Sequence, residues 1–284
     1  MASSEAWFFH THMWRQYCVA YRSGAIDRSF AVEHDGQLVA ICPLIQEDDQ
    51  FTMGGEPGLA PLQIWGGGIY QMLFEELDRL QAKHQIRRIA FRCIPPLEEI
   101  DYVQAGYRDI SWSTRILDLT QSEADLWHDI RKGHKADIRK AERRYMIVAD
   151  GRENGGGLID VYRYVHERAH PGARSARTYQ YQWQWWRQGF AMAAVATDES
   201  VIGAAYFLLY KDVAYYASSA SLIPDIMAAI LWRAMLALKA RGIKTLELGW
   251  QGKATDEKGK QVEHFKRGMG GIDVPIYAVE RRDS

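Results

Sequence analysis

The stretch FAMAAVATDESVIGAAYFLLYKDVAYYASSA, residues Phe190 to Ala220, decides the fold class of this chain. It contains three β-rich runs, which the polar breaks Thr197-Asp198-Glu199 and Lys211-Asp212 separate. Short β-rich runs bounded by polar turn residues are typical of strands. The stretch therefore predicts a meander of antiparallel strands.

The residues after this meander predict a helix and one more strand. Pro224 precedes a mostly apolar segment of helical length, residues 225–240. Gly242 follows it, and IKTLELGW, residues 243–250, has the composition of a strand. A meander followed by a helix and a strand indicates an α/β fold of the α+β kind.

The first part of the chain repeats this order of elements. A helix is predicted over 4–21, and two β-rich runs then flank Asp35-Gly36. Asp-Gly between such runs is the strongest short signal for a hairpin. A further helix is predicted over 69–84 and a strand over 86–93.

The repeated order predicts a duplicated domain. KHQIRRIAFR in the first part of the chain echoes ARGIKTLELG in the second. Because the repeat is as long as a domain, it indicates duplication and not a solenoid. We predict two halves, 1–112 and 113–284, each with a mostly antiparallel, mixed sheet.

The composition is that of a soluble globular protein, with 47% hydrophobic and 25% charged residues. The formal net charge is −1, so any contact with nucleic acid would need a local basic patch. Cys18, Cys42 and Cys93 are widely spaced among apolar residues, which indicates thiols in a reducing compartment. We find neither a signal peptide nor a membrane-spanning run, so we expect a cytoplasmic protein. The sequence does not give the oligomeric state.

One helix is predicted over 123–144, and its surface is rich in cations. Residues three and four apart are neighbours on a helix, so several of these cations share one stripe. Such a stripe suits a pyrophosphate or an RNA backbone. A solvated face is an equal alternative, because acidic residues are interleaved. The candidate binding residues here are Lys135, Arg139 and Lys140.

A second candidate binding segment is PGARSARTYQYQWQWW, residues 171–186. Arg174 and Arg177 lie there in a predicted loop beside five aromatic residues. Arginine with tyrosine and tryptophan can clamp a nucleotide or a sugar ring and its phosphate. The tryptophans cannot all face one side of a helix, so core packing of part of the segment is an equal alternative.

Three segments carry a resemblance to a known family. Gly106 to Arg144 contains a Gly-aromatic turn, a strand that ends on Asp-Leu, and a helix with the stretch Ile-Arg-Lys-Ala. Gly242 to Gly249 is the last predicted strand, and VEHFKRGMGG, Val262 to Gly271, has a Phe-Lys pair ahead of Gly-Gly. Together these segments resemble the Fem family. Its members are tandem-GNAT enzymes that add amino acids to peptidoglycan precursors, and it has GNAT acyltransferase relatives.

The resemblance implies two tandem GNAT-like halves, with the active site in the C-terminal half, 113–284. It also implies that Lys266 holds the oxyanion of the tetrahedral intermediate or the phosphate of the donor, and that Phe265 packs against the donor. From the residues alone, a solvated loop lysine and a core phenylalanine are the alternative.

Acyl transfer to an amine also needs a general base. Asp256 is the catalytic candidate, because it lies in a predicted loop that leads to the Phe-Lys pair. Glu247, Glu263 and His264 are further candidates. Tyr216 is another, and it is also a candidate substrate-binding residue.

The chain departs from the family pattern at two places. A standard GNAT acetyltransferase has a glycine-rich loop whose N–H groups hold the pyrophosphate of CoA. This chain has SLIPDIMAAILW there, residues 221–232, and Pro224 removes one N–H. The difference argues against ordinary CoA binding. The coiled-coil arm of the Fem family is also missing after the basic helix, which favours an acceptor smaller than a cell-wall precursor.

The sequence therefore favours an N-acyltransferase. Its co-substrate would be aminoacyl-tRNA or acyl-CoA, with tRNA as a partner in the first case, and we expect no tightly bound cofactor. The acceptor would be an amine of a sugar, a nucleotide or a small peptide. We find no H-E-x-x-H, C-x-x-C or P-loop, and no metal site is predicted. The alternative is a non-catalytic GNAT-like module that binds a nucleotide-sugar or a glycan.

Overall fold

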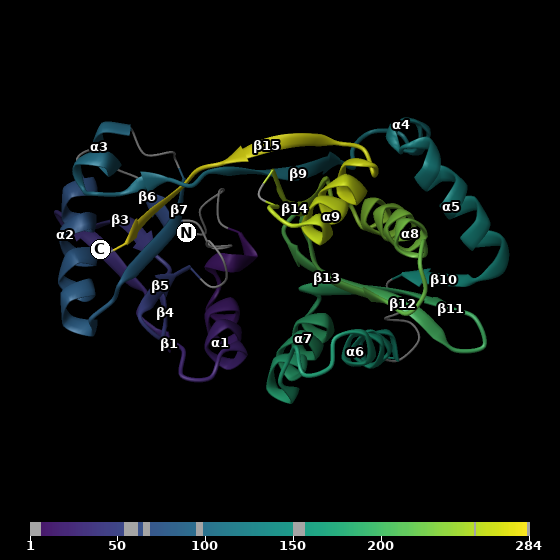
Figure 1. Ribbon diagram of the computed structural model, residues 1–284, viewed down its shortest axis with the longest axis horizontal. Helices are drawn as coiled ribbons and strands as arrows, with labels where there is room; N and C mark the ends of the chain where they lie inside the picture. The colour runs from purple at the N-terminus through teal and green to yellow at the C-terminus, as the bar shows by residue number, and fades with distance from the viewer. Residues whose placement is uncertain are drawn as a thin grey trace. The chain divides into compact units, whose positions relative to one another are not determined.

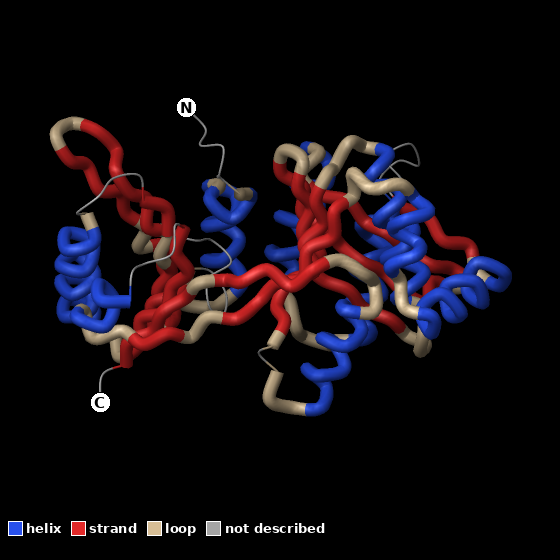
Figure 2. Tube along the Cα trace, turned by 90° about the horizontal axis from the view of Figure 1, so that it is seen from above, coloured by secondary structure: helices blue, strands red, loops and turns tan. Residues whose placement is uncertain are grey.

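The chain divides into two compact units in the computed structural model. Unit 1 contains Met1–Trp112 and Pro275–Ser284, and unit 2 contains Ser113–Val274. Both units combine helices with strands, as Figure 1 and Figure 2 show. The predicted α/β class is therefore confirmed. The structure describes residues 7–53, 62–64, 69–94, 99–149, 157–252 and 254–282.

The described strands of unit 1 form one mixed sheet. They run in the order β1-β4-β5-β7-β6-β3-β2, and β16 pairs with both β7 and β8. The pairs β5–β7 and β6–β7 are parallel, and the other pairs are antiparallel. The elements are η1 (Phe8–His10), α1 (His12–Tyr21), β1 (Ile26–Asp27), β2 (Phe30–His34), β3 (Gln37–Cys42), β4 (Ile45–Glu47), β5 (Gln50–Thr52), β6 (Leu62–Ile64), α2 (Tyr70–His84), β7 (Arg88–Ile94), α3 (Glu99–Gln104), β8 (Arg108–Asp109) and β16 (Ala278–Arg282).

The predicted hairpin is confirmed. Strands β2 and β3 pair antiparallel, and His34 lies opposite Gln37. The two residues between them, Asp35 and Gly36, have φ values of 51° and 73°. Two consecutive positive φ values define the turn that matches the twist of a hairpin, and Asp-Gly tolerates them well. The single helix predicted over 4–21 is wrong: residues 4–6 lie outside the described part, and the extended Thr11 separates η1 from α1.

The end of the chain lies in unit 1. The sequence grouped it with 113–284, but β16 pairs with β7 from Ala278 opposite Arg92 to Arg282 opposite Arg88. Pairing between strands so far apart in the chain leaves no local sequence signal, because it depends on which edge of the sheet is open.

Unit 2 has its own sheet, in the order β10-β11-β12-β13-β14-β9-β15. The predicted meander is confirmed as β11, β12 and β13, which pair antiparallel, whereas β13 and β14 are parallel. The elements are β9 (Trp112–Asp118), α4 (Glu123–Asp129), α5 (Lys132–Arg144), β10 (Met146–Ala149), α6 (Gly157–Ala169), α7 (Ala176–Gln188), β11 (Ala191–Thr197), β12 (Val201–Tyr210), β13 (Val213–Ser221), α8 (Met227–Ala240), β14 (Thr245–Gln251), α9 (Glu257–Arg267) and β15 (Ile272–Ile276).

Helices cover both faces of the unit 2 sheet. Helices α6 and α7 pack on one face, and α8, with α5 against it, packs on the other (Figure 1). The α8 face holds the main apolar core, which includes Ala214, Leu246 and Leu248. Because neighbouring strand residues point to opposite faces, Tyr215 and Glu247 point to the α6 and α7 face.

The single helix predicted over 123–144 is wrong, because the structure has two helices there. Between α4 and α5, Ile130 and Arg131 have extended ψ values of 133° and 143°. The Arg131 N–H donates to the carbonyl of Gly268, after α9. Burial of Ile130 and this long-range bond are tertiary contacts that helical periodicity does not contain.

Two further helices lie where the sequence suggested loops. Helix α7 includes Arg177, begins after Ser175, whose side chain accepts from the Thr178 N–H, and ends at Gly189 with φ 88°. Helix α9 begins after Asp256, whose carboxylate accepts from the Gly259 N–H at 2.6 Å. These are ordinary capping signals. They were overlooked in the sequence because aromatic and charged residues dominate the two segments.

Candidate active site

The parallel strands β13 and β14 diverge within unit 2. Their pairing covers three residue pairs and ends at Tyr215 opposite Glu247. Both strands are irregular near this point, with a register shift between Tyr206 and Phe207 in the β12–β13 pair and another between Glu247 and Gly249 in the β14–β9 pair. Bulges re-aim side chains and end regular pairing, so they open the two strands to a ligand.

Lys266 lies beside this divergence, on α9. Its side chain is buried, with 5% of the residue exposed. The Nζ atom donates to the carbonyl of Trp250 at 3.3 Å and lies 4.5 Å from the centre of the Trp250 ring. The alternative of a solvated loop lysine is therefore wrong: this lysine is in a helix and buried.

Because Gly249 has no side chain, the Lys266 amine and the Tyr215 hydroxyl can both lie close to it. A Cβ on Gly249 would lie 3.5 Å from Lys266 Nζ and 3.2 Å from the Tyr215 hydroxyl. Its φ of 80° also disfavours any other residue. The amine and the hydroxyl thus lie over the same piece of bare backbone.

Two carboxylates act on the charge of Lys266. Burial lowers the pKa of Lys266 to about 8, and the charges of Glu263 and Glu247 oppose this shift. Glu263 accepts from the Ala254 N–H at 2.9 Å, and Glu247 accepts from the Thr114 hydroxyl at 2.7 Å. A buried cation with a lowered pKa next to buried carboxylates is typical of catalytic sites.

Gln251, at the end of β14, is a further buried polar residue. It is fully buried, and neither its side-chain oxygen nor its nitrogen has a hydrogen-bond partner within the residues that the structure describes. A buried amide without partners costs free energy, and native proteins rarely retain one without a reason. A polar ligand group at this end of the strand would satisfy it. We call Lys266, Tyr215, Glu247 and Glu263 the Lys266 cluster.

The other two catalytic candidates from the sequence lie outside this cluster. Asp256 is the exposed N-cap of α9. Phe265 packs against the apolar core, and its ring centre lies 5.1 Å from that of His134 on α5. The Nε2 atom of His134 donates to the Phe265 carbonyl at 3.0 Å, so this part of α9 is anchored to α5.

The glycine pair after Lys266 fits against the sheet backbone. A Cβ on Gly271 would lie 2.2 Å from the carbonyl oxygen of Ile116 on β9. Gly270 and Gly271 have φ values of 90° and 82°. The two glycines therefore make a tight turn, and the backbone at Gly271 packs closely against β9.

The basic candidates on α5 are mostly exposed. Arg139 and Lys140 lie on the solvent side, and the Arg139 guanidinium is 5.4 Å from the centre of the Trp127 ring. Lys135 instead turns back and donates to the His128 carbonyl at the end of α4, at 2.8 Å. His134 is buried on the opposite side of the helix. Two of the three candidates thus remain available to an anionic ligand.

Arg174 and Arg177 have different surroundings. Arg177 is exposed in the first turn of α7, whereas Arg174 is half-buried and its Nε donates to Nε2 of His166 at 3.4 Å. His166 Nδ1 therefore carries the proton and donates to the Tyr179 hydroxyl at 2.9 Å. Burial, followed by the charges of Arg174 and His170, lowers the pKa of His166 to about 4. The ring is thus neutral at physiological pH.

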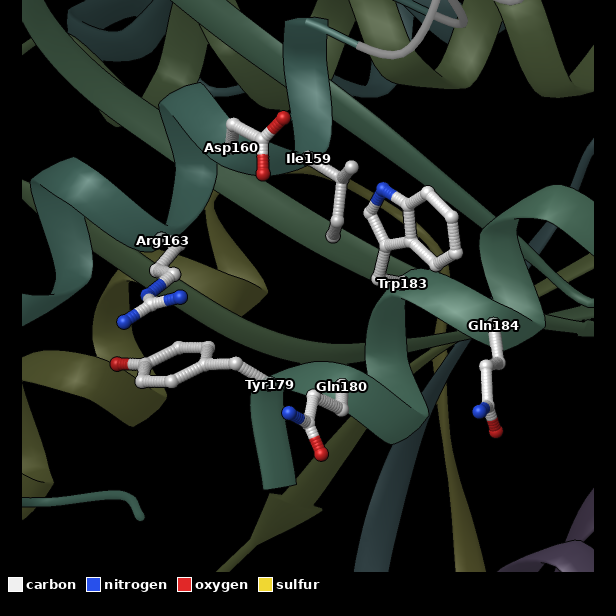
Figure 3. A pocket seen from close by; sticks show the side chains of 7 residues that line it. All are labelled: Ile159, Asp160, Arg163, Tyr179, Gln180, Trp183 and Gln184. Carbon is white, nitrogen blue, oxygen red and sulfur yellow. The ribbon is translucent and has the colours of Figure 1, made fainter. Parts of the chain in front are cut away.

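A pocket of about 330 Å³ opens between α6 and α7 (Figure 3). Arg163 lies over the ring of Tyr179, 5.3 Å from its centre, and the half-exposed Trp183 lines the other side. Trp185 and Trp186 are buried, which agrees with the alternative that part of this segment packs in the core. The pocket is lined from α6 and α7 alone, so it contains none of the Lys266 cluster.

Tyr216 lies on β13, and its hydroxyl donates to Ser219 at 2.5 Å. Burial raises the pKa of Tyr216 to about 12, and the bond to Ser219 opposes this shift. A phenol with so high a pKa is a poor base at neutral pH. Of the base candidates from the sequence, Glu247 and Glu263 are the ones that lie in the Lys266 cluster.

Three more findings concern metal binding, a membrane-spanning helix and the cysteines. Within the described residues, no three His, Cys, Asp or Glu side chains are grouped to hold a metal ion, and no helix is long and apolar enough to cross a membrane. Cys18 and Cys42 are buried free thiols, and the side chain of Cys93 lies outside the described part.

Sequence reasoning missed Tyr215 and Gln251. A signal for them exists in Gly249, because an isolated glycine within a strand pattern suggests a bulge or a close approach. The residues around such a glycine deserved to be candidates. No signal in the sequence joins Tyr215 to Lys266, because only the parallel pairing of β13 with β14 brings them together.

Comparisons with known proteins find similarity in structure but not in sequence. No family model matches the chain, and no curated protein matches it. The solved structure of FemX superposes with a TM-score of 0.62 at 11% identity, over 99% of this chain and 94% of that one. L-PGS from Bacillus licheniformis gives a TM-score of 0.60 at 13% identity, over 95% and 87%.

A tandem GNAT protein from the clavulanic acid biosynthesis pathway gives a TM-score of 0.55 at 14% identity, over 95% of this chain and 87% of that one. At such low identity the similarity bears on the fold alone. It extends over both halves of the chain, and it agrees with the family resemblance of the sequence. The chain therefore has the Fem-like tandem-GNAT fold.

Proposed function

We propose that this chain is an N-acyltransferase whose reaction centre is the Lys266 cluster of unit 2. The observation that carries the proposal is the buried amine of Lys266, which lies with the Tyr215 hydroxyl over Gly249 where β13 and β14 diverge. The three similar proteins include a GNAT protein, and acyl transfer is the chemistry expected from the family resemblance.

Lys266 would stabilise the oxyanion of the reaction. The acceptor amine attacks the acyl carbon, the carbonyl oxygen becomes negatively charged, and a fixed cation lowers the energy of that state. With a pKa of about 8, Lys266 is mostly protonated near pH 7 and can donate to the oxyanion. When the bond to the leaving group breaks, the Tyr215 hydroxyl can supply the proton that this group takes up.

Glu247 is the best-placed base for the acceptor amine. It lies opposite Tyr215 in the parallel pairing and is 3% exposed. The Thr114 hydroxyl holds one of its oxygens at 2.7 Å. A carboxylate fixed in this way can take the proton that the amine loses on attack.

The donor would be aminoacyl-tRNA or acyl-CoA, and both carry phosphates. Unit 2 contains 24 Lys and Arg against 19 Asp and Glu, a net charge of +5, although the whole chain has −1. The exposed Arg139 and Lys140 add to this field on α5. A basic unit favours an anionic donor. We expect the acceptor to be an amine of a sugar, a nucleotide or a small peptide.

The test offers the protein radiolabelled acetyl-CoA or radiolabelled aminoacyl-tRNA, with glucosamine, an aminonucleoside or a dipeptide as acceptor. We expect an N-acylated product from one of the donors. Lys266→Met should lower kcat and kcat/KM together by about a hundredfold or more, because the lost bond forms only in the transition state. Lys260→Met is the matched control, since Lys260 is an exposed lysine on the same helix.

The pH dependence of the rate is a second test of the role of Lys266. The wild-type rate should fall as pH rises through about 8, because Lys266 then loses its proton. The residual rate of Lys266→Arg should show no such fall, because arginine stays charged. A Lys266→Met enzyme with near-normal kcat would exclude the catalytic role. Ligand binding without any product would favour the non-catalytic module.

A further inference from the structure

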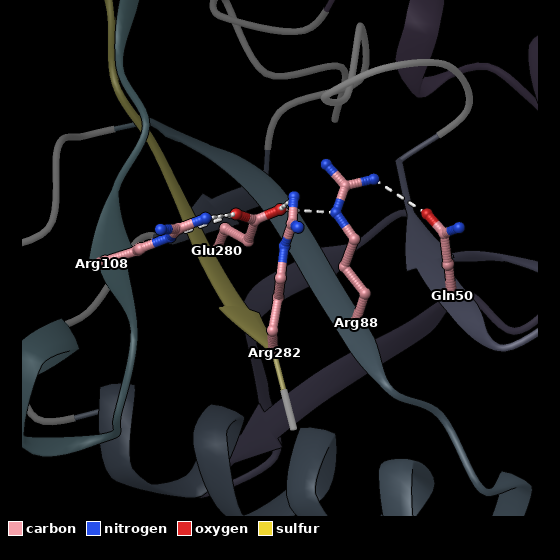
Figure 4. Close-up of polar contacts among 5 residues, drawn as sticks. All are labelled: Gln50, Arg88, Arg108, Glu280 and Arg282. Atoms are coloured by element: carbon pink, nitrogen blue, oxygen red, sulfur yellow. Dashed lines mark hydrogen bonds and ion pairs between the residues drawn. The ribbon is translucent and has the colours of Figure 1, made fainter. Parts of the chain in front are cut away.

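Unit 1 contains a buried carboxylate with three arginines around it (Figure 4). Glu280 lies on β16 and is 2% exposed. Arg88 comes from β7, Arg108 from β8 and Arg282 from β16 itself. These strands are neighbours in the sheet, so the four side chains gather on one face.

The hydrogen bonds divide the two carboxylate oxygens among the arginines. Arg108 donates to Oε2 through Nη2 at 2.7 Å and through Nε at 3.2 Å. Oε1 accepts from Arg88 Nε at 2.5 Å and from Arg282 Nη2 at 3.0 Å. Gln50 accepts from Arg88 Nη1 at 2.8 Å. The guanidiniums are thus held in fixed positions around one anion.

This arrangement has more positive charge than Glu280 neutralises. Burial alone would raise the pKa of Glu280, but the hydrogen bonds from the arginines outweigh it and lower the pKa to about 2. The carboxylate is therefore charged at physiological pH, and three guanidiniums around it leave a surplus of two positive charges. One arginine would be enough to pair a carboxylate, so pairing alone does not explain the other two.

The surplus charge faces solvent. The Arg108 and Arg282 side chains are 67% and 59% exposed, whereas Arg88 is 18% exposed and bonded to Gln50. Within the described residues, Arg282 bonds only through Nη2 and Arg108 only through Nε and Nη2. Their remaining N–H groups make no hydrogen bond within the described residues, and both side chains are largely exposed. A planar fork of N–H groups matches the oxygens of a phosphate.

We propose that Arg108 and Arg282 bind the phosphate of a small ligand, a phosphate monoester or a diphosphate, and that Glu280 holds the two guanidiniums in place. The proposal concerns unit 1 and is independent of the Lys266 cluster. A dianion matches the surplus of two positive charges.

The charge of unit 1 favours a small ligand over a nucleic acid. This unit contains 11 Lys and Arg against 17 Asp and Glu, a net charge of −6. An acidic body repels a long polyanion, because every further phosphate meets more negative surface. The arginine cluster is a local exception to that field, so it suits one phosphate group or two adjacent ones.

The test is isothermal titration of the full chain with inorganic pyrophosphate, AMP and ADP at low salt. The variant is Arg108→Gln with Arg282→Gln, which leaves Glu280 and Arg88 unchanged. We expect the double variant to bind at least about tenfold more weakly, because each arginine contributes a charge-assisted hydrogen bond. Arg22→Gln, an exposed arginine of the same unit, is the control and should bind like wild type.

A second measurement separates binding from folding. The Nε–H signals of arginine in NMR spectra should shift for two arginines when pyrophosphate is added, and these signals should be lost in the double variant. Equal pyrophosphate affinity in wild type and the double variant would overturn the proposal, and so would wild type that binds no phosphate compound. A single-stranded RNA that competes at this cluster more tightly than ADP would overturn the choice of a small ligand.

Discussion

Glu280 in unit 1 and Lys266 in unit 2 are both buried charged residues, and their surroundings act on the charge in opposite ways. Hydrogen bonds from three arginines overcome the burial of Glu280 and lower its pKa to about 2, so the charge is stabilised. Burial dominates at Lys266 and lowers its pKa to about 8, so the charge is destabilised. A compensated buried charge supports the fold, whereas an uncompensated one persists where chemistry uses it.

The two units also differ in net charge. The value of −1 for the whole chain is the sum of −6 for unit 1 and +5 for unit 2. A neutral total therefore hides a basic unit that contains the candidate active site. Unit 2 therefore has the net positive charge that contact with nucleic acid would need, although the whole chain does not.

The largest effect should follow from the loss of the compensated charge. Glu280→Gln leaves three arginines without their anion, and we expect unit 1 to lose roughly 3 to 5 kcal/mol of stability. The folded pKa lies below the unfolded one, so in wild type this stabilisation is present above about pH 4.5 and is lost as pH falls toward about 2. Hydrogen exchange of β7 and β16 peptides measures it separately from unit 2.

Glu33→Gln, on the exposed part of β2, is the control for Glu280→Gln and should leave exchange unchanged. Unchanged protection of β16 in Glu280→Gln would contradict the prediction, because the carboxylate would then contribute nothing to the stability of unit 1.

The uncompensated charge should cost stability at neutral pH, and a rise in pH should remove this cost. Lys266 has a folded pKa of about 8 against 10.5 in the unfolded chain, so the unfolded state binds more protons between these values and stability rises with pH there. The rise should be at most roughly 3 kcal/mol. Lys266→Met should lack it and be at least as stable as wild type at pH 7. Urea unfolding at pH 7, 8, 9 and 10 measures the difference, and an equal slope in both proteins would contradict it.

The smallest effect should come from exposed cations of unit 2. Arg139→Ala with Lys140→Ala should weaken binding of the phosphorylated donor and reduce its salt dependence by roughly 0.7 to 0.9 for each lost phosphate contact. Stability should change by less than about 0.5 kcal/mol. The measurement is donor affinity across a salt series. Arg168→Ala with Lys244→Ala removes two other exposed cations of unit 2 and should leave the slope unchanged, and equal slopes in all three proteins would indicate a solvated face.

Part of the candidate site could be read from the sequence, and part could not. The Phe265-Lys266 pair ahead of Gly270-Gly271 drew attention to Lys266. Its partners escaped notice, since Tyr215 is about fifty residues earlier in the chain and only the parallel pairing brings it near. Asp256 was predicted to lie in a loop, but it is the N-cap of α9. This helix was overlooked because charged residues dominate its sequence.

The sequence by itself determined the elements that depend on neighbouring residues. The meander from Ala191 to Ser221, the Asp35-Gly36 hairpin and α8 follow from strand composition, turn residues and apolar runs, which are local properties. Tertiary structure decided the break between α4 and α5, the return of β16 to unit 1 and the burial of Lys266 and Glu280. Each of these depends on a contact between residues far apart in the chain, and the free energy of such a contact is absent from any short stretch of sequence.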